Sequence, residues 1–332
     1  MAGRGSRLRP HTLTTPKPLI PIAGKTIVER LVENIVSICK KKVSEISFII
    51  GDFGEETELE LIKIAEKLGA KGTICYQKEP LGTAHAILCA KKSLNGNVVV
   101  AFADTLFKAN FSLEDDSDGI IWVKEIEDPS AFGVVRLNEK NIVTEFVEKP
   151  KNPVSNLAII GIYYFKSGER LRKELQYLID KNIKDKGEFQ LTSALENMKK
   201  SGAQFIPGKV DEWLDCGNKE AVLNTNKFLL DNQKTKTPAS LQEKIIESKI
   251  IQPCCFGKNV TIYNSIIGPN VTIGDNNTIE NCKISNTLIQ NKNIIKNAHI
   301  VNSMLGSHIE YIESINSKEH EVSIGDFTTI KK

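Results

Sequence analysis

Hydrophobic positions in the first 230 residues follow two different spacings. Short apolar runs, typical of strands that are buried on both faces, occur at residues 46–50, 72–77 and 97–103. Apolar side chains at helical spacing occur at residues 26–42, 55–68 and 83–93. This alternation predicts an α/β fold with a mainly parallel, doubly wound, Rossmann-like sheet that helices cover on both sides.

Two of these helices carry more specific signals. Thr26 and Glu29 have the spacing of a capping box at the start of the first helix. The second helix has one apolar face, which we expect to be buried and which consists of Leu59, Ile62, Ala65 and Leu68.

Beyond residue 119 the order of elements changes. Short strands dominate from 119 to 166, followed by helical stretches at 168–181 and 188–201, a strand near 203–206 and a helix at about 218–231. The polar stretch after this helix contains Pro238, and we interpret residues 233–245 as a linker. A first domain is therefore predicted at residues 1–232.

The tail has a repeat of its own, with apolar residues at about every sixth position and Asn-rich turns between them. The series comprises Ile250, Phe256, Ile262, Ile267, Ile273, Ile279, Ile284, Ile289, Ile295 and Ile300. Such a repeat is typical of a left-handed parallel β-helix, in which each repeat forms one side of a triangular coil. Residues 246–332 are therefore predicted to form a hexapeptide-repeat β-helix of about four coils; the alternative is a loose Asn-rich strand region.

The charge balance narrows the class of partner. The chain of 332 residues has 44 Lys and Arg against 41 Asp and Glu, a net charge of +3, which gives no reason to expect a nucleic acid or a membrane surface as partner. No apolar run approaches the ~18 residues that span a bilayer, and the N-terminus lacks the apolar segment of a signal peptide. Seven cysteines lie mostly in apolar runs without CxxC pairs, which favours reduced thiols in a cytoplasmic protein.

Glycines and cations alternate at the N-terminus. Gly3, Gly5 and Ser6 form a glycine-rich loop, and Arg7 and Lys17 follow it. Glycine lets backbone N–H groups approach an anion closely, and the cations add charge against a polyphosphate. The string is neither a Walker A motif nor the dinucleotide fingerprint. On chemistry alone, it is either a phosphate-binding loop or a basic arm.

The string from Gly3 to Lys25 reads GxGSRLxPxTxxxPKPLxPxxGK. It closely resembles the signature of the sugar-1-phosphate nucleotidylyltransferases, also called sugar-nucleotide pyrophosphorylases. Further family marks follow in order: QKEPLGTAHA at 77–86, Ala103-Asp104, Gly133, Glu148-Lys149-Pro150, Gly161, GEFQLTSAL at 187–195 and WLDCG at 213–217. The resemblance covers residues 1 to about 232, and the repeat matches a tail that many members carry.

The resemblance implies a reaction in which a sugar 1-phosphate joins the α-phosphate of a nucleoside triphosphate and pyrophosphate is released. The nucleophile is already an anion, so catalysis consists of positioning and charge neutralisation. Gly3, Gly5 and Ser6 would cradle the triphosphate. Arg7 would hold the departing pyrophosphate, and Lys17 would contact the α-phosphate region.

The resemblance also implies positions for the base, the sugar phosphate and a metal ion. The base-reading residues would be Gln77, Gly82 and Thr83, and the sugar-phosphate residues would be Gly133, Glu148, Lys149 and Gly161. Asp104 and Asp215 would hold Mg²⁺, which prefers oxygen ligands. Both carboxylates have a simpler interpretation, because Asp104 can end a strand and Asp215 can cap the following helix.

One feature departs from the family pattern, and a second indicates which substrates within the family to expect. Members have a hydrophobic strand directly before the glycine loop, whereas only Met1 and Ala2 precede Gly3 here. We therefore expect that this first strand is missing from the chain, either because the natural reading frame begins upstream or because the chain is truncated. Ile159, two positions before Gly161, and the string WLDCGN resemble the glucose 1-phosphate enzymes that use dTTP or UTP.

The expected activity is therefore the formation of dTDP- or UDP-glucose. Mannose-1-phosphate guanylyltransferase and N-acetylglucosamine-1-phosphate uridylyltransferase are alternatives within the class. An acyltransferase that uses the β-helix and a non-catalytic, sugar-nucleotide-binding regulatory subunit are alternatives outside it. Removal of residues 240–332 is expected to abolish acetyl transfer and to spare nucleotidyl transfer. Because an open-ended solenoid exposes strand edges, we also expect a homo-oligomer built partly through residues 245–330.

Overall fold

The computed structural model describes residues 5–109, 117–150, 152, 154–233, 244–315 and 317–332. Gly3 and most of the predicted linker at 233–245 therefore lie outside the described residues. Contacts divide the chain into two compact units. Of the described residues, unit 1 contains those within Leu31–Trp213, and unit 2 contains residues 5–30 together with those within Leu214–Lys332. Helix α1 (Ile27–Ile38) and strand β12 (Glu212–Asp215) run from one unit into the other.

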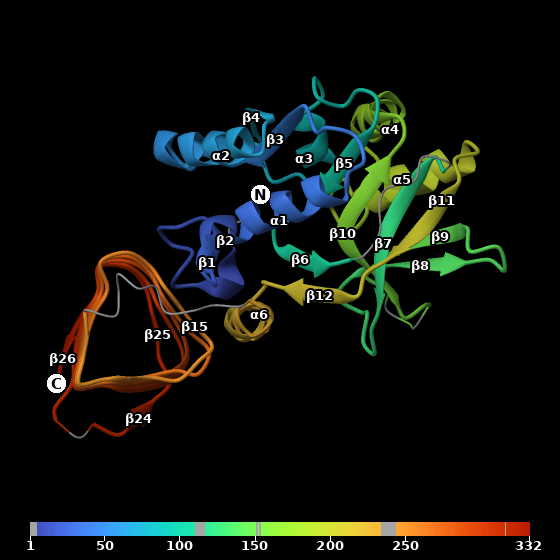
Figure 1. The fold of residues 1–332 in the computed structure, drawn as a ribbon. Helices are drawn as coiled ribbons and strands as arrows, with labels where there is room; N and C mark the ends of the chain where they lie inside the picture. The colour runs from blue at the N-terminus through green and yellow to red at the C-terminus, as the bar shows by residue number, and fades with distance from the viewer. Residues whose placement is uncertain (1–4, 110–116, 151, 153, 234–243, 316) are drawn as a thin grey trace. The chain divides into compact units, whose positions relative to one another are not determined.

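Unit 1 is built around a six-stranded sheet with the order β11-β7-β10-β8-β9, in which β5 also pairs with β10 (Figure 1). Its strands are β5 (Val98–Ala101), β7 (Gly119–Glu125), β8 (Gly133–Leu137), β9 (Val143–Glu148), β10 (Leu157–Phe165) and β11 (Phe205–Lys209). Strand β6 (Thr105–Lys108) follows β5. A separate pair, β3 (Glu45–Ile50) and β4 (Lys71–Tyr76), is connected by helix α2 (Glu55–Lys67).

The strand directions agree only in part with the predicted parallel sheet. The pairs β3–β4 and β11–β7 are parallel. The neighbours of the central strand β10, which are β5, β7 and β8, all run antiparallel to it. Strands β7 to β10 follow one another without an intervening helix among the described residues. Because a parallel neighbour needs a long crossover, usually a helix, this part of the chain turns back on itself and pairs antiparallel.

Three helices share one hydrophobic core with this sheet: α3 (Thr83–Cys89), α4 (Gly168–Asp180) and α5 (Leu191–Lys200). In α4, Leu171, Leu175 and Leu178 recur at helical spacing and are fully buried. They belong to the same cluster as Phe165 and Phe205, whose rings meet edge to face with centroids 6.3 Å apart. The helical stretches expected near 168–181 and 188–201 are thus present, and their apolar faces form the core of unit 1.

Of the apolar face predicted for α2, only Ala65 is buried, while Ile62 and Leu68 are half-buried. The residues that α2 buries are Leu61, Ile64 and Ala65, whereas Leu59 is 56% exposed. The sequence ELELIKIAEK places apolar residues at alternate positions, so two overlapping helical stripes are available. Packing against β4 selects the stripe that starts at Leu61.

Unit 2 combines the N-terminal segment with helix α6 (Lys219–Asn232) and the C-terminal repeat. The N-terminal segment has little regular structure. It contains short 3₁₀ turns at Ser6–Leu8 and Lys17–Leu19 and the hairpin of β1 (Pro21–Ile22) and β2 (Lys25–Thr26). At the start of α1, the Glu29 N–H donates to Thr26 Oγ1 at 3.2 Å, which confirms the backbone half of the predicted cap.

The repeat forms a parallel β-solenoid whose coils are triangular (Figure 1). One side consists of β13 (Ile245–Ile246), β16 (Thr261–Tyr263), β19 (Thr278–Glu280), β21 (Ile294–Lys296), β23 (Glu310–Ile312) and β26 (Thr329–Lys331). The other sides consist of β14 (Lys249–Ile250), β15 (Cys254–Phe256), β17 (Ile266–Ile267), β18 (Val271–Ile273), β20 (Lys283–Ile289), β22 (His299–Leu305), β24 (Glu319–His320) and β25 (Ser323–Ile324). Six stacked strands on one side make the solenoid longer than the four coils expected.

The coil length explains why the repeat looks irregular in the sequence. Paired residues on one side of the triangle are 17, 17, 16, 16 and finally 19 positions apart, from Ile245 to Ile330. A strict six-residue repeat would give a constant coil length. The predicted aliphatic positions nevertheless all belong to the solenoid core or pack against it, so the inward side chains follow the sequence prediction. The handedness of the coils stays a prediction.

The abundance of Asn in the tail has a structural cause. Many corners of the coils are occupied by Asn in the left-handed region of φ, which Asn tolerates better than most residues. Their side chains hydrogen-bond from coil to coil: Asn264 Nδ2 donates to Asn281 Oδ1 at 2.8 Å, and Asn281 Nδ2 donates to Asn297 Oδ1 at 3.0 Å. These columns of amides tie successive coils together at their corners.

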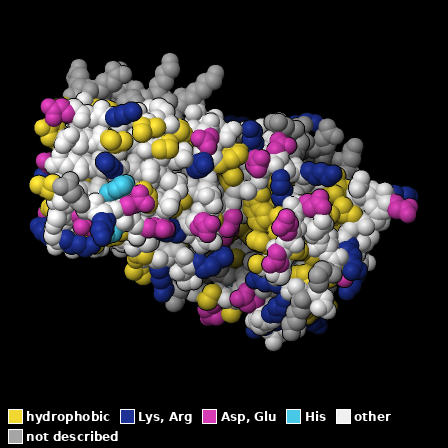
Figure 2. Space-filling view, turned by 90° about the horizontal axis from the view of Figure 1, so that it is seen from below, with side chains coloured by type: hydrophobic (Ala, Val, Ile, Leu, Met, Phe, Trp, Pro, Cys, Tyr) yellow, Lys and Arg dark blue, Asp and Glu magenta, His cyan; other side chains and the backbone are white. Residues whose placement is uncertain are grey.

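The surface distribution of charged side chains agrees with the nearly equal numbers of acidic and basic residues in the sequence. On the face in view in Figure 2, basic and acidic side chains are interspersed, in keeping with the net charge of +3. Burial raises the pKa of the Cys254 and Cys282 thiols to about 11, so these solenoid cysteines pack as neutral thiols. In the described part of the chain, we find no helix with the length and apolar character needed to cross a bilayer.

Among the histidines in the described part of unit 2, His11 has the pKa that departs most from its usual value. Only 1% of its surface is exposed, and its Nε2 lies 3.0 Å from Ser323 Oγ. Burial lowers the pKa of His11 to about 4, with smaller opposing effects of Asp326, which raises it, and Lys219, which lowers it. An unfolded chain binds this proton near pH ~6.5, so between about pH 4 and 6.5 the unfolded state holds more protons and stability rises with pH.

We therefore expect acidification from about pH 7 to 4.5 to lower the melting temperature of the wild-type protein more than that of His11→Gln. Gln keeps a hydrogen-bonding amide at this position but cannot be protonated. The full effect of His11, reached below pH ~4, is about 3 kcal/mol. Calorimetric melting of both proteins across this pH range checks the expectation, and parallel curves would contradict it.

Candidate functional site

Strands β8 and β9 bring Gly133 and Glu148 together in unit 1. The two residues are paired in the register of these strands. A Cβ on Gly133 would lie 3.1 Å from Glu148 Oε2 and 3.3 Å from Ile159 Cδ1. Thr192 Oγ1 of α5 donates to Glu148 Oε2 at 3.3 Å. Thr192 thus restrains one oxygen of the carboxylate, beside a stretch of backbone that carries no side chain.

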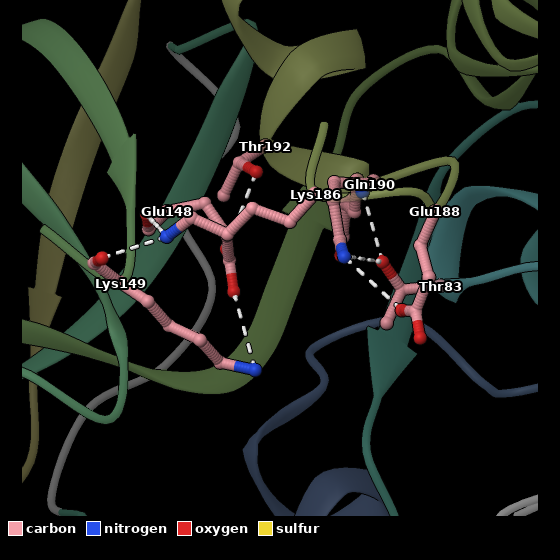
Figure 3. A network of polar contacts seen from close by, with 8 residues as sticks. Thr83, Glu148, Lys149, Lys186, Glu188, Gln190 and Thr192 are labelled. Atoms are coloured by element: carbon pink, nitrogen blue, oxygen red, sulfur yellow. Dashed lines mark hydrogen bonds and ion pairs between the residues drawn. The ribbon is translucent and has the colours of Figure 1, made fainter. Parts of the chain in front are cut away.

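Lys149 follows in a backbone conformation that few non-glycine residues adopt, with φ of 44°. Its N–H donates to Phe132 O at 3.1 Å. Figure 3 shows Lys186 reaching the same bend, where its Nζ donates to the carbonyls of Glu148 and Lys149 at 2.9 and 2.8 Å. The Lys149 side chain remains 55% exposed, and its Nζ lies 4.0 Å from Glu148 Oε1. Lys186 therefore fixes the bend from which Lys149 presents its charge.

The loop before α3 is fastened to the segment before α5. Gly82 has φ of 113°, and a Cβ on it would lie 2.5 Å from Phe189 O, so a larger residue does not fit. Gln77 Nε2 donates to Gly82 O at 3.1 Å. Thr83 Oγ1 donates to Gln190 Oε1 at 3.2 Å and accepts the first N–H of α5 at 2.9 Å (Figure 3). Gln77, Gly82 and Thr83, predicted together as base-reading residues, are brought together by these contacts.

Asp104 lies half-buried between β5 and β6. Two residues earlier, the Phe102 N–H donates to Gly161 O at 2.8 Å. Gly161 has φ of 83°, and the register between β10 and β7 shifts across it, between Ile159 and Tyr163. A Cβ on Gly161 would lie 3.0 Å from the Phe102 ring. The irregularity at Gly161 therefore shapes the path of the chain that leads to Asp104.

In unit 2, the glycine loop folds back on the residues that follow it. Gly5 is left-handed, with φ of 58°. A Cβ on it would lie 3.1 Å from Thr12 Cγ2 and 3.2 Å from Lys17 Cβ. Thr12 Oγ1 donates to Gly5 O at 2.8 Å. Gly5 thus allows Lys17 to approach the loop closely, while the side chains of Ser6 and Arg7 are exposed.

Asp215, at the end of β12, lies beside the same loop. A Cβ on Gly217 would be 2.9 Å from Asp215 Oδ2 and 3.2 Å from Arg7 Nη2, so the carboxylate and the guanidinium both lie near this glycine. Helix α6 is capped by Asn218, whose Oδ1 accepts a backbone N–H of the first turn at 2.9 Å. The alternative interpretation of Asp215 as the helix cap was therefore wrong.

Sequence reasoning missed three side chains that hold others in place: Lys186, Gln190 and Thr192. Gln190 and Thr192 lie within GEFQLTSAL, which was recognised as a family mark without a role for either residue. Their polar character directly before and inside a buried helix turn was the available signal, because buried polar groups need partners. Lys186 gave no signal, since a lysine before glycine reads as a solvated loop residue.

Each unit offers one half-buried carboxylate from the predicted metal pair, Asp104 in unit 1 and Asp215 in unit 2. Among the described residues, no three or more His, Cys, Asp or Glu side chains gather as ligands of a metal ion. Mg²⁺ is usually held by one or two carboxylates together with substrate phosphates. The carboxylate oxygens of each residue are of the donor type that Mg²⁺ prefers.

Comparison with known proteins identifies relatives over most of the chain. The low-salt glycan biosynthesis nucleotidyltransferase Agl11 of Haloferax volcanii is 29% identical over 92% of this chain and 90% of its own length. The glucose-1-phosphate thymidylyltransferase of Streptomyces antibioticus is 27% identical over 99% and 97%, respectively. The bifunctional protein GlmU of Methanocaldococcus jannaschii is 34% identical over 74% of this chain, which spans 57% of GlmU.

Solved structures share the fold at lower identity. The nucleoside-diphosphate-sugar pyrophosphorylase of Vibrio cholerae superposes with a TM-score of 0.59 at 20% identity, over 68% of this chain and 98% of its own. A UDP-glucose pyrophosphorylase in complex with UDP-glucose gives 0.55 at 23% identity, over 70% and 97%. The predicted nucleotide-sugar transferase fold, with a solenoid at the C-terminus, is thus confirmed. Residues 1–232 match the family described as Nucleotidyl transferase, and the chain belongs to this family of enzymes.

Proposed function

We propose that this nucleotidyltransferase couples glucose 1-phosphate to dTTP or UTP and releases pyrophosphate. An oxygen of the sugar phosphate attacks the α-phosphorus, and the bond from that phosphorus to the oxygen that bridges to the β-phosphate breaks. The bridging oxygen leaves with the pyrophosphate. Because the nucleophile is already an anion, the step needs no general base, and the enzyme contributes positioning and charge neutralisation.

The arrangement at the end of β9 carries the proposal. The Glu148 carboxylate is held by Thr192 beside the Gly133 backbone, so it can accept hydrogen bonds from sugar hydroxyls. The Lys149 side chain next to it is 55% exposed, and its Nζ lies 4.0 Å from that carboxylate. At this distance the ion pair is weak and a phosphate can compete for the ammonium. A substrate that carries both hydroxyls and a phosphate matches this pair.

The nucleotide would be bound by the remaining predicted residues. Ser6 and Gly5 would offer backbone N–H groups to the phosphates, Arg7 would hold the pyrophosphate, and Lys17 would contact the α-phosphate. The base would be read by Gln77, Gly82 and Thr83. Gly161 would lie against the sugar. Gly3, which belongs to the same family loop, lies outside the described residues.

Asp104 and Asp215 would hold Mg²⁺, which, when bound, neutralises charge on the phosphate oxygens. Asp215 and Arg7 both lie close to the position that a Cβ on Gly217 would occupy. We propose that this small residue lets a carboxylate and a guanidinium serve the same polyanion without a side chain between them. Substitution of Gly217 by a larger residue would separate the two charges.

Two observations support glucose 1-phosphate and leave a second candidate. Ile159 places an apolar atom beside Gly133, where a polar residue would be expected to serve an acetamido group. The Streptomyces relative that aligns along nearly the whole chain is named a glucose-1-phosphate thymidylyltransferase. The second candidate, N-acetylglucosamine-1-phosphate uridylyltransferase, is supported by the GlmU relative, which matches over little more than half of its own length.

The assay that tests the reaction measures pyrophosphate release with Mg²⁺ from ATP, GTP, dTTP and UTP, each with glucose, N-acetylglucosamine or mannose 1-phosphate. We expect the highest kcat/KM for glucose 1-phosphate with dTTP or UTP. Asp104→Asn is expected to lower kcat by about a hundredfold or more without loss of fold, because it removes a metal ligand's charge. Highest activity with N-acetylglucosamine 1-phosphate would favour the second candidate. Highest activity with GTP and mannose 1-phosphate would overturn both candidates. No pyrophosphate release with any substrate pair would refute the proposed activity.

Lys186 gives a separate test of the sugar-phosphate assignment. Lys186→Met removes the two hydrogen bonds that hold the Glu148–Lys149 bend. We expect the KM for the sugar phosphate to rise about fivefold, with the KM for the nucleotide unchanged. Lys186→Arg, which can donate to both carbonyls, should restore most of the affinity. The exposed Lys181→Met is the charge-matched control, and an equal effect of the two Met variants would contradict the assignment.

Self-association through the solenoid is the last element of the proposal. Ile246, Tyr263 and Ile294 lie on the β13–β26 side and are 49%, 41% and 43% exposed. Such apolar side chains on a flat sheet face favour contact with a second copy. Sedimentation velocity at micromolar concentration should show an oligomer, and Tyr263→Lys should shift it towards the monomer. A wild-type protein that sediments only as a monomer would refute this.

A further inference from the structure

The last coil of the solenoid contacts the segment that follows the nucleotide loop. Ser323 Oγ lies 3.0 Å from Nε2 of the buried His11. Thr14 Oγ1 donates to Asp326 Oδ2 at 2.6 Å. Between these two contacts, a Cβ on Gly325 would lie 2.9 Å from Pro10 Cβ, so the absence of a side chain permits the close approach. We refer to His11, Thr14, Ser323 and Asp326 as the last-coil contact.

The last-coil contact is one short step from the nucleotide loop. Thr12 lies between His11 and Thr14, and its Oγ1 donates to Gly5 O at 2.8 Å. The same carbonyl accepts the Leu8 N–H at 2.9 Å and closes the 3₁₀ turn that carries Arg7. The side chains that bind Ser323 and Asp326 therefore flank the side chain that holds Gly5.

The far end of the segment is held by the same solenoid. Asn226 of α6 is fully buried, and its Oδ1 accepts the Ala23 N–H at 3.0 Å and the Thr272 hydroxyl at 2.7 Å. A Cβ on Gly24 would lie 2.8 Å from Cys255 Sγ, so the hairpin turn sits directly on the solenoid. The segment from Gly5 to Gly24 is thus fixed near both of its ends.

Charge contacts connect the last coil to the start of α6 as well. Lys219 Nζ lies 2.8 Å from Glu321 Oε1. Lys219 is the first residue of α6, and it follows Asp215 and Gly217 closely in the chain. The last coil therefore contacts two segments: the one that follows Arg7 and the one that follows Asp215.

We propose that the last solenoid coil, through Ser323 and Asp326, positions the nucleotide-binding loop of residues 5–7. The N-terminal segment has only two 3₁₀ turns and a two-residue hairpin of its own, so its shape depends on the elements that hold it. Ser323, Asp326, His11 and Thr14 are positioning residues, since they act through Thr12 and Gly5. Loss of the solenoid would then impair nucleotidyl transfer, contrary to the expectation from the sequence that removal of residues 240–332 spares it.

This inference rests on the proposed function only for its kinetic readout. The test variant is Thr14→Val combined with Ser323→Ala, which removes both hydroxyls in the full chain and leaves the charge of Asp326 in place. The matched control is Ser314→Ala combined with Thr329→Val, which removes two exposed hydroxyls elsewhere on the last coil. Ser323→Thr, which keeps a hydroxyl, is the rescue variant for the Ser323 contact.

For the test variant, we expect the KM for the nucleotide to rise about fivefold, with the KM for the sugar phosphate and the melting temperature close to those of the control. Hydrogen exchange of peptides covering residues 5–20 should become faster in the test variant only. Equal exchange in the test and control variants would overturn the inference. Faster exchange throughout unit 2 with a lower melting temperature would also overturn it, because the contact would then serve stability alone.

The exchange measurement keeps the two proposals distinguishable, because it needs no turnover. If the wild-type protein is inactive with every substrate pair, the proposed function fails, and faster exchange at residues 5–20 still supports the inference. If the wild-type protein is active and the test variant matches the control in both readouts, the inference fails and the function stands.

Discussion

Unit 2 depends on one buried acceptor, the side-chain oxygen of Asn226. It receives one hydrogen bond from the backbone of the N-terminal hairpin and one from the Thr272 hydroxyl of the solenoid. Three stretches of chain that are far apart in the sequence therefore meet at a single atom with 0% exposure of its residue. Removal of this oxygen would leave two buried donors without an acceptor, at about 1–3 kcal/mol each. The amide thus fixes the hairpin, α6 and the solenoid as one body.

The same principle operates in unit 1 at the site that we propose for the sugar phosphate. Charge is delivered there by Lys149, a long flexible side chain, but its backbone is held by bonds to carbonyl groups from Lys186 and by its own N–H. A flexible cation on a fixed backbone can follow a phosphate through a reaction with little reorganisation of the protein. Glu148, in contrast, is restrained at the carboxylate itself, through the hydrogen bond from Thr192. Lys149 is therefore restrained at its backbone, which suits its proposed partner, a phosphate that moves during the reaction. Glu148 is restrained at its carboxylate, which suits its proposed partner, a sugar that stays in place.

Local patterns in the sequence predicted most elements of this fold but few of its contacts. Helical periodicity located α4, α5 and α6, and the six-residue repeat identified the inward positions of the solenoid. Helical periodicity failed at Leu59 of α2, where two apolar stripes overlap and the packing of the helix against β4 decides which one is buried. The direction of the strands around β10 was also missed, since periodicity reports burial and not the course of the connections.

Contacts over long sequence separations were out of reach for a different reason. His11 and Ser323 are 312 positions apart, and a lone histidine or serine carries no local mark of its partner. The motifs Glu148-Lys149 and Gly82-Thr83 were found because a family string contains them. Lys186 was missed because it binds two backbone carbonyl groups, which every residue type carries. Side chains that act on substrate leave a pattern in the sequence, but side chains that hold the backbone of others leave little.

The geometry of the solenoid corner explains how the last coil can serve two purposes. At this corner, a side-chain oxygen accepts a backbone N–H of the preceding coil: Asp275 Oδ1 from Lys258, Asn291 Oδ1 from Asp275, and Asp326 Oδ1 from Ser307, at 2.7, 2.8 and 2.8 Å. Either Asn or Asp can supply that one oxygen. A carboxylate, however, has a second acceptor oxygen, and in Asp326 this Oδ2 receives the Thr14 hydroxyl. The first oxygen closes the corner and the second holds the N-terminal segment. A residue of the repeat thereby also contacts the segment that follows the proposed nucleotide loop.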